Sequence, residues 1–210
     1  MKNHLIKFVF FAALTSVPAS AWALFEARLT YGSLVSQQSL TDICQGSCTA
    51  PSDAPSIVPT FGLGADAIVT LPFVPVGIGL RYEDMKLSTS SANIEADLKY
   101  KRTALLINYR LIDTILHIGP IASIGISHSG SMNLKEGGTE RINLSSGSVS
   151  SYSLGLEVGA KPLIVVPIKI GAEAGYMMYD WGKMTNSVDG TQKDINLSGY
   201  YLKVFLGLDI

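Results

Sequence analysis

The stretch Tyr200–Ile210, YYLKVFLGLDI, places apolar or aromatic side chains at every second position. One set is Tyr200, Leu202, Val204, Leu206, Leu208 and Ile210, and the other set includes Lys203, Gly207 and Asp209. An unbroken period of two is typical of a β-strand and not of a helix. At about 3.3 Å per residue, such a strand crosses a hydrocarbon layer when it is tilted. The stretch therefore predicts a membrane-spanning strand that closes a barrel.

The same alternation recurs along the chain and predicts eight strands in all. They span residues 25–33, 58–69, 76–86, 97–110, 115–132, 149–161, 168–181 and 195–210. Four polar connections, residues 36–56, 87–96, 133–148 and 182–194, alternate with three short ones. Long loops on one side and tight turns on the other are typical of outer-membrane barrels. The predicted fold is all-β, an eight-stranded antiparallel transmembrane β-barrel with up-and-down meander order.

Composition agrees with strands that cross a membrane. The chain is 47% hydrophobic and only 16% charged, with 20 glycines, whereas soluble domains carry about 25% charged residues. After the N-terminal segment, no apolar run reaches the roughly 18 residues that indicate a transmembrane helix. The formal net charge of −1 does not indicate a nucleic acid partner. The sequence also contains no motif that predicts a cofactor.

Residues 1–23, MKNHLIKFVFFAALTSVPASAWA, have the features of a secretory signal peptide. Lys2 and Lys7 form a positive region, an apolar segment follows, and Ala-x-Ala cleavage sites end at Ala21 and Ala23. We expect cleavage near Ala23, which leaves residues 24–210 as the barrel domain. Export to an oxidising compartment favours a disulfide between Cys44 and Cys48. A metal site at these cysteines would need further ligands.

The second face of each strand is rich in glycine, serine and charge, and it decides which face points inward. An eight-stranded barrel is just wide enough for side chains to fill its interior, and buried charges must be paired. The predicted lumen charge network comprises Glu26, Arg28, Asp66, Arg81, Glu83, Glu157, Lys169, Glu173 and Lys203. Arg110 shares this polar phase, and Lys203 is expected to pair with Glu26 or Glu173. The prediction is a plugged lumen; the alternative is a narrow channel or small-solute conduit lined by these charges.

Two local patterns refine the prediction. Aromatic residues near the loop ends predict an interfacial belt. They are Tyr31, Tyr82, Tyr152, Tyr176, Tyr179, Trp181 and Tyr200. Leu98 and Tyr100 are out of phase with Thr103 to Tyr109, which indicates either a bulge near Lys101–Arg102 or emergence of the strand above the membrane.

The signal peptide, eight alternating strands and apolar final strand together resemble the small outer-membrane barrels of Gram-negative bacteria, of the OmpA, OmpX and OmpW kind. The resemblance covers residues 24–210 and rests on architecture without a family-specific motif. It implies a monomer in the bacterial outer membrane, surrounded by lipid and lipopolysaccharide, with four loops exposed for structural or surface-interaction roles. It also implies recognition of Tyr200–Ile210 by the barrel-assembly machinery, although this chain ends on Ile210 where an aromatic residue is usual.

Two further alternatives stay open on the sequence. Some eight-stranded barrels are lipid-modifying enzymes of the outer leaflet, and those known as lipid A deacylases carry a His and a Ser two residues apart. The comparable stretch here is His128 with Ser129 and Ser131. Neither serine lies two residues from His128, so the pair does not match the deacylase spacing, and we expect no enzyme activity. The second alternative is a soluble calyx, whose apolar phase would point inward.

Overall fold

The computed structural model describes residues 24–54, 58–71, 74–91, 93–113, 115–145, 149–162 and 167–209. The predicted signal peptide, residues 1–23, and the terminal Ile210 lie outside the described residues. Within the described ranges, no helix is both long and apolar enough to cross a membrane.

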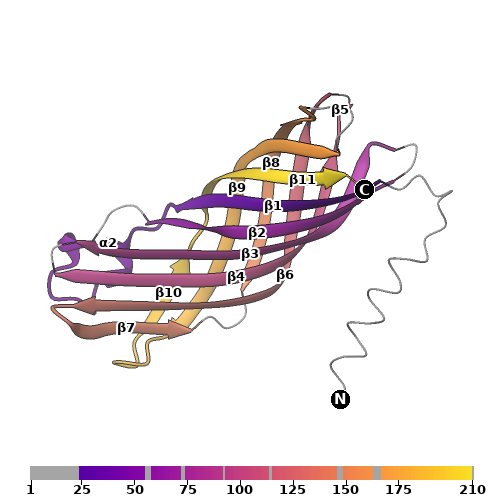
Figure 1. The fold of residues 1–210 in the computed structure, drawn as a ribbon. Coiled ribbons are helices and arrows are strands. Elements are labelled where there is room, and N and C mark those ends of the chain that lie inside the picture. The colour runs from indigo at the N-terminus through magenta and orange to yellow at the C-terminus, as the bar shows by residue number, and fades with distance from the viewer. Residues whose placement is uncertain are drawn as a thin grey trace, which may run out of the picture.

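Eight strands of the described chain form a closed antiparallel ring (Figure 1). They are β1 (Leu24–Ser36), β2 (Val58–Thr70), β3 (Val76–Ser91), β4 (Ile94–Tyr109), β6 (Leu116–Glu136), β8 (Ser150–Ala160), β9 (Ile168–Thr185) and β11 (Gly199–Asp209). The ring closes where β11 pairs with β1, from Glu26 opposite Asp209 to Ser36 opposite Gly199. The other pairs of the ring join strands that follow one another in the chain when β5, β7 and β10 are left out. The predicted eight-stranded meander barrel is therefore confirmed, and its last strand closes it as expected.

The strands continue further at one end of the barrel than at the other. At the short-turn end, the chain passes from β2 to β3, from β4 to β6 and from β8 to β9, and β5 (Ile112–Asp113) adds two paired residues to β6. At the opposite end, which we call the extended end, strands β3, β4 and β6 run on beyond β1 and β2 (Figure 1). There β7 (Thr139–Ser145) pairs with β6, and β10 (Gln192–Asn196) pairs with β9.

Much of the sequence predicted as long polar loops is regular structure. The connection predicted over residues 87–96 is wrong, because β3 continues to Ser91 and β4 begins at Ile94. The connections predicted over 133–148 and 182–194 contain β7 and part of β10. The first connection carries a short helix, α2 (Leu40–Cys44), and a 3-10 turn, η1 (Pro51–Asp53). These segments form strands because apolar residues on their inner face alternate with polar residues that face water.

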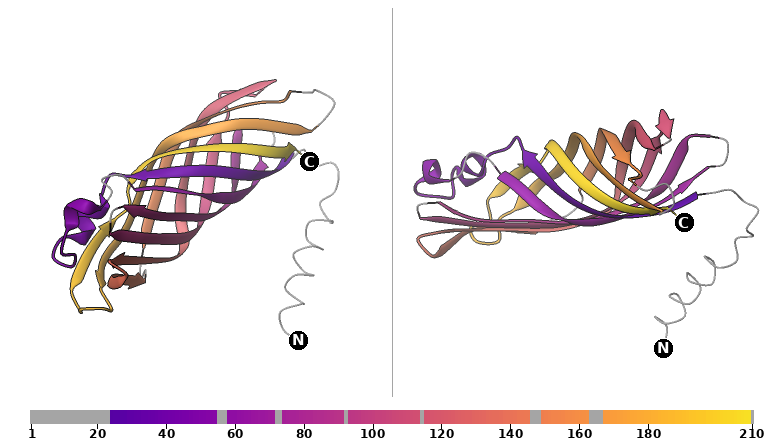
Figure 2. Two further views of the ribbon diagram at one scale, coloured as in Figure 1. Left: turned by 60° about the vertical axis from the view of Figure 1, so that its left-hand side comes forward. Right: turned by 45° about the horizontal axis from the view of Figure 1, so that its top comes forward.

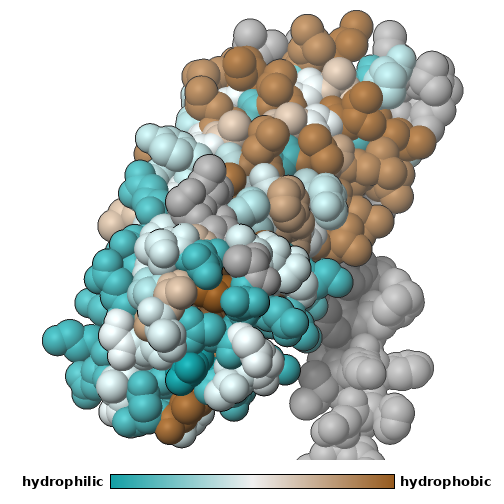
Figure 3. Space-filling view, turned by 90° about the vertical axis from the view of Figure 1, so that its left-hand side faces the viewer, coloured by the Kyte–Doolittle hydropathy of each residue, from teal (hydrophilic) through white to brown (hydrophobic). Residues whose placement is uncertain are grey.

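The outer wall of the ring is apolar, as the assignment of the phases required. Leu29 and Leu63 on β1 and β2, and Leu154 on β8, are each about two-thirds exposed. Figure 3 shows hydrophobic side chains gathered over the ring, while the extended end is mostly hydrophilic. Of the predicted aromatic belt, Tyr31, Tyr82, Tyr152 and Tyr200 are exposed on this wall. Tyr179 and Trp181 are not belt residues, because both side chains point inward and are buried.

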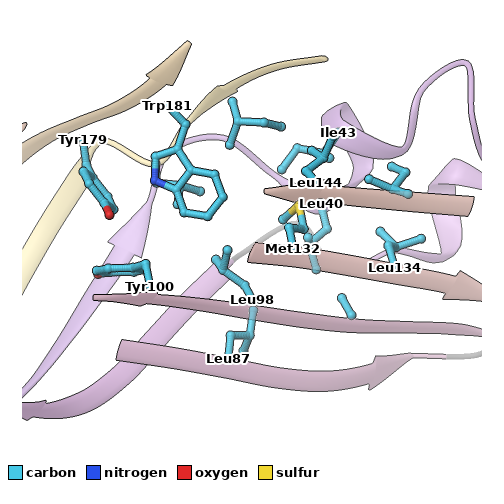
Figure 4. Packing of buried hydrophobic residues seen from close by; sticks show 14 of the residues in the cluster. Leu40, Ile43, Leu87, Leu98, Tyr100, Met132, Leu134, Leu144, Tyr179 and Trp181 are labelled. Carbon is cyan, nitrogen blue, oxygen red and sulfur yellow. The ribbon is translucent and has the colours of Figure 1, made fainter. Parts of the chain in front are cut away.

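The inner face of the extended end holds an apolar core (Figure 4). Its residues are Leu34, Leu40, Ile43, Cys44, Ala54, Met85, Leu87, Ile94, Ala96, Leu98, Tyr100, Met132, Leu134, Ile142, Leu144, Met177, Tyr179, Trp181, Met184, Ile195, Leu197 and Tyr201. Leu40 and Ile43 come from α2, which folds against the strands here (Figures 2 and 4). One end of the barrel is thus filled by a conventional hydrophobic core.

Strand β4 settles the phase question at Leu98 and Tyr100. Its residues alternate between buried and exposed from Ile94 to Tyr109 without a break, so no bulge lies at Lys101–Arg102. The register shift is on the partner strand, where Thr103 faces Ser127 and Ala104 faces Gly125. Leu98 and Tyr100 therefore continue the inward face of β4 into the extended end. Emergence of the strand above the membrane stays a prediction.

Candidate functional site

Charged side chains fill the interior of the ring from the short-turn end up to the apolar core. Every second residue of each strand points inward, and glycines on this inner face leave room for long side chains. Gly159 is an example, because a Cβ atom there would overlap the ring of His117. All nine residues of the predicted lumen charge network are buried inside the barrel.

The layer nearest the short-turn end is centred on Glu26. Its carboxylate accepts hydrogen bonds from Arg28 Nε at 2.6 Å and Lys169 Nζ at 3.0 Å, and it also contacts Arg110. Lys169 Nζ lies 3.1 Å from Asp209 on the last strand. One carboxylate thus receives three cations from three different parts of the chain.

The next layer joins Arg28 to Glu157 on the far side of the ring. Arg28 Nη1 and Nη2 donate to the two carboxylate oxygens of Glu157, at 2.5 and 3.1 Å. Asn108 donates to the same carboxylate at 2.9 Å. The Arg28 guanidinium also lies 4.3 Å from the ring centre of Phe205, a cation–π contact. These contacts cross-link β1, β4, β8 and β11 through the interior.

A third layer is a buried triad of Asp66, Arg81 and Glu173. Arg81 donates to both oxygens of Asp66 at 2.8 Å, and to Glu173 at 2.9 and 2.7 Å. Paired contacts of this kind are the strong geometry for a guanidinium and a carboxylate. Tyr201 donates its hydroxyl to Glu173 at 2.7 Å. The triad leaves Arg81 only 1% exposed.

The uppermost layer, which is the one nearest the apolar core, surrounds Glu83. It shows that one predicted ion pair was wrong. Arg102 Nη1 donates to Glu83 Oε2 at 2.7 Å, and Lys203 Nζ lies 2.5 Å from Glu83 Oε1. Lys203 therefore pairs with Glu83 across the lumen, and not with Glu26 or Glu173 as predicted. Glu173 is Lys203's neighbour in the strand register, but its oxygens already receive Arg81 and Tyr201. The long lysine side chain reaches the free oxygen of Glu83 instead.

The structure adds two charges, Arg102 and Asp209, and buries Arg110, which the sequence placed in the same polar phase. With the other nine, the described residues contribute six acids and six bases to the interior. Arg102 could have been found from the sequence. It continues the inward alternation of Ala104, Leu106 and Asn108, and the suspected bulge concealed that phase.

His128, the candidate catalytic histidine, does not meet its neighbouring serines. Its Nε2 atom lies 2.8 Å from the hydroxyl of Ser151, which also accepts a hydrogen bond from Arg102 Nε at 2.7 Å. Ser151 is only 1% exposed, and Arg102 donates a further bond to Ser123. The hydroxyl is thus held within the uppermost lumen layer and not at the outer wall, where a lipid substrate would lie.

Three local interactions order the first connection, and the last of them joins it to the extended end. Cys44 and Cys48 form a disulfide with a Cα–Cα distance of 5.3 Å. Ser39 caps α2 and shares a capping box with Asp42, and the Ser39 hydrogen bonds lower the pKa of the Asp42 carboxyl. Glu136 accepts backbone hydrogen bonds from Thr49 at 3.0 Å and Ala50 at 2.8 Å. These donors lower the pKa of Glu136.

Comparison with known proteins rests on structure alone, since no protein-family model and no curated protein matches the sequence. The attachment invasion locus protein Ail of Yersinia pestis, solved with the heparin analogue sucrose octasulfate, is similar with a TM-score of 0.52 at 10% identity. That match covers 90% of this chain and 99% of Ail. A major outer membrane protein from Thermus thermophilus is similar with a TM-score of 0.54 at 8% identity, covering 89% of this chain and 99% of that one. This chain therefore has the fold of the small outer-membrane β-barrels.

Proposed function

We propose that the protein is a monomeric barrel of the bacterial outer membrane whose lumen is closed by ion pairs and whose extended end serves a structural or surface-interaction role. The supporting observation is the contrast between the outer wall and the interior. Leu29, Leu63 and Leu206 project from the wall, which is the arrangement that lipid requires. The inward face of the same strands carries paired charges, whose exposure to lipid would be energetically costly.

A closed lumen, and not a conduit, is favoured by how the charges are used. Arg28, Arg81 and Arg102 each bridge carboxylates or hydroxyls on more than one strand. A conducting path would need these contacts to separate, which would leave buried charges without partners at a cost of several kcal/mol each. Above them, the apolar core fills the same axis.

The extended end would face the cell exterior, with the short turns in the periplasm. Its β-hairpins, α2 and the disulfide make it a rigid platform, and rigid scaffolds with variable connections are where binding functions are commonly placed. In this proposal lipid and lipopolysaccharide surround the wall, and the assembly machinery recognises Tyr200–Ile210. The proposed role involves no chemical reaction.

Two measurements test this proposal. After sodium carbonate washing, the protein should remain in the membrane fraction; recovery in the supernatant would refute the membrane assignment. In planar bilayers, the purified protein should give only background leak, whereas discrete ohmic openings would support the conduit alternative instead.

A double substitution in the third layer provides a second test by conductance. The double variant Arg81→Ala/Glu173→Ala removes one base and one acid from the third layer and so leaves the net charge of the lumen unchanged. We expect it to conduct more than the natural protein, because the removed side chains leave space for water. Equal background leak from a correctly inserted double variant would mean that the third layer is not what closes the lumen.

A further inference from the structure

A basic ridge lies on the outer wall at the level where the wall changes from apolar to charged. On β3 the outward residues run from Leu80 and Tyr82 to Asp84 and Lys86, and on β4 the corresponding change comes at Lys101. In a barrel embedded as proposed above, this level is that of the lipid head groups. The ridge consists of Lys86, Lys99 and Lys101.

Two of these lysines are directly opposite each other. Lys86 on β3 is the register partner of Lys99 on β4, and both are exposed. Like charges in this arrangement repel and destabilise a sheet. Lys101 is 3.7 Å from Asp84, whereas neither Lys86 nor Lys99 forms an ion pair with any other described residue. The wall thus places side by side two cations without an ion-pair partner in the described part of the chain, and the carboxylate of Asp84, which lines the grooves beside them, is paired with Lys101.

Two grooves meet at this ridge. The larger, of about 850 Å³, is lined on its apolar side by Tyr31, Phe61 and Leu63. Its charged side has Lys86, Lys99 and Asp84, the carboxylate that pairs with Lys101. It forms where β2 begins at Val58 while β3 and β4 continue to Ser91 and Ile94. Phe61 is the register partner of Lys86, so an apolar surface reaches up to the charge itself.

The second groove, of about 420 Å³, lies on the other side of Lys99. Its lining includes the ion pair of Lys101 and Asp84, together with Ser129 and Ser131 of β6. Both serines are exposed, and their hydroxyls can donate to or accept from a polar group. Across the two grooves, the order is therefore an apolar surface, a row of cations and a hydroxyl-bearing wall.

We infer that this surface binds a phosphorylated glycolipid of the surrounding membrane, an inference that rests on the proposed membrane location. Acyl chains would lie against Tyr31, Phe61 and Leu63, and a phosphate would lie between Lys86 and Lys99. The sugar to which the phosphate is attached would contact Ser129 and Ser131. The anion removes the repulsion between the two lysines, and lysine is a common ligand for phosphate as a point charge.

The test uses the full barrel inserted into phosphatidylcholine nanodiscs with increasing amounts of a disaccharide bisphosphate glycolipid, or its dephosphorylated form. Amide NMR shifts at Lys86 and Lys99 report binding. Each lysine near an anionic lipid contributes about fivefold in affinity, so Lys86→Gln/Lys99→Gln should weaken binding roughly 25-fold. Lys86→Arg/Lys99→Arg, which keeps the charge, should retain it. The control Lys135→Gln/Lys183→Gln makes the same charge change at exposed lysines outside both grooves.

The outcomes separate this inference from the membrane proposal. Failure to insert into the nanodisc would refute the membrane location and the site together. Insertion with equal binding of the phosphorylated and dephosphorylated lipids would overturn the site alone, as would unchanged binding by Lys86→Gln/Lys99→Gln. Inorganic phosphate should produce no comparable shifts; if it reproduces them, the lipid assignment is wrong.

Discussion

The two halves of the barrel interior are filled by opposite chemistries. Within the ring, the inward residues are charged and form ion pairs across the lumen, as at Arg81 and Glu173. At the extended end the same faces of the same strands carry apolar residues, such as Leu98 and Leu134. On the outer surface the order is reversed: apolar residues such as Leu63 and Leu154 are exposed on the ring, whereas the extended end is mostly hydrophilic on the face shown in Figure 3.

The difference shows what each half must satisfy. In the proposed location, lipid surrounds the wall of the ring, so apolar residues are needed outside, and the interior can use charge because the charges are paired. Where water surrounds the wall, the hydrophobic effect requires the apolar residues inside. Strand β4 passes through both environments with a single unbroken alternation. The two halves should therefore respond differently to mutation.

The largest effect is expected from breaking the triad of the ring. Arg81→Met leaves Asp66 and Glu173 buried without their shared cation, and removal of one partner from a buried ion pair costs about 3–5 kcal/mol. Urea unfolding in phospholipid vesicles, followed by circular dichroism, should show a clearly lower midpoint.

The apolar replacement of the whole triad is the matched control. Asp66→Leu/Arg81→Met/Glu173→Met removes all three charges together, so no charge of the triad is left unpaired, and it should recover most of the lost stability. If Arg81→Met unfolds at the natural midpoint, the lumen ion pairs do not stabilise the ring.

A somewhat smaller and more local effect is expected from the apolar core. Leu98→Ala removes a fully buried side chain and should cost about 3 kcal/mol through lost burial and a cavity. Trp181 lies in this core and, once the predicted signal peptide with Trp22 is removed, it is the chain's single tryptophan. In the Leu98→Ala variant, the Trp181 fluorescence should therefore change at a lower urea concentration than the circular dichroism signal.

Leu105→Ala is the control on the same strand. Leu105 faces outward from β4, so its truncation leaves no enclosed cavity and should move the fluorescence transition much less. Coincident fluorescence and dichroism transitions in Leu98→Ala would show that the two halves unfold as one unit.

Alternation in the sequence was sufficient to predict the ring, because lipid-facing strands show both a period of two and an apolar excess. The extended end also has the period, for example in Ile94, Ala96 and Leu98, but its serines and acids suggested loops. The lumen set was predictable as a phase, since Glu26 and Glu173 fall on the polar face of their strands. Their partners were not, because the cross-lumen contact between Lys203 and Glu83 depends on closure and on which oxygens are already occupied.

A third effect concerns the disulfide of the extended end. The double variant Cys44→Ser/Cys48→Ser opens a loop of sequence separation four, and loop-closure entropy assigns about 2 kcal/mol to such a short loop. Cys44 is part of the apolar core, so the loss should shift the Trp181 fluorescence transition by less than Leu98→Ala. A shift of the dichroism transition by the same amount would contradict the independence of the two halves.

The smallest effect is expected from protonation at Glu136, which fastens the first connection to β6. Because backbone hydrogen bonds lower the pKa of Glu136 in the folded chain, this stabilisation is complete above the ordinary value of 4.5 and is lost as the pH falls through the lowered pKa. Hydrogen exchange at the Thr49 and Ala50 amides should therefore show less protection in acid than at neutral pH, after correction for the intrinsic pH dependence. Glu136→Gln cannot titrate and should show the weaker protection at both pH values. If acid leaves the protection of the natural protein unchanged, the carboxylate is not what holds this connection, and other contacts, such as the packing of Leu40 and Ile43 in the apolar core, hold it instead.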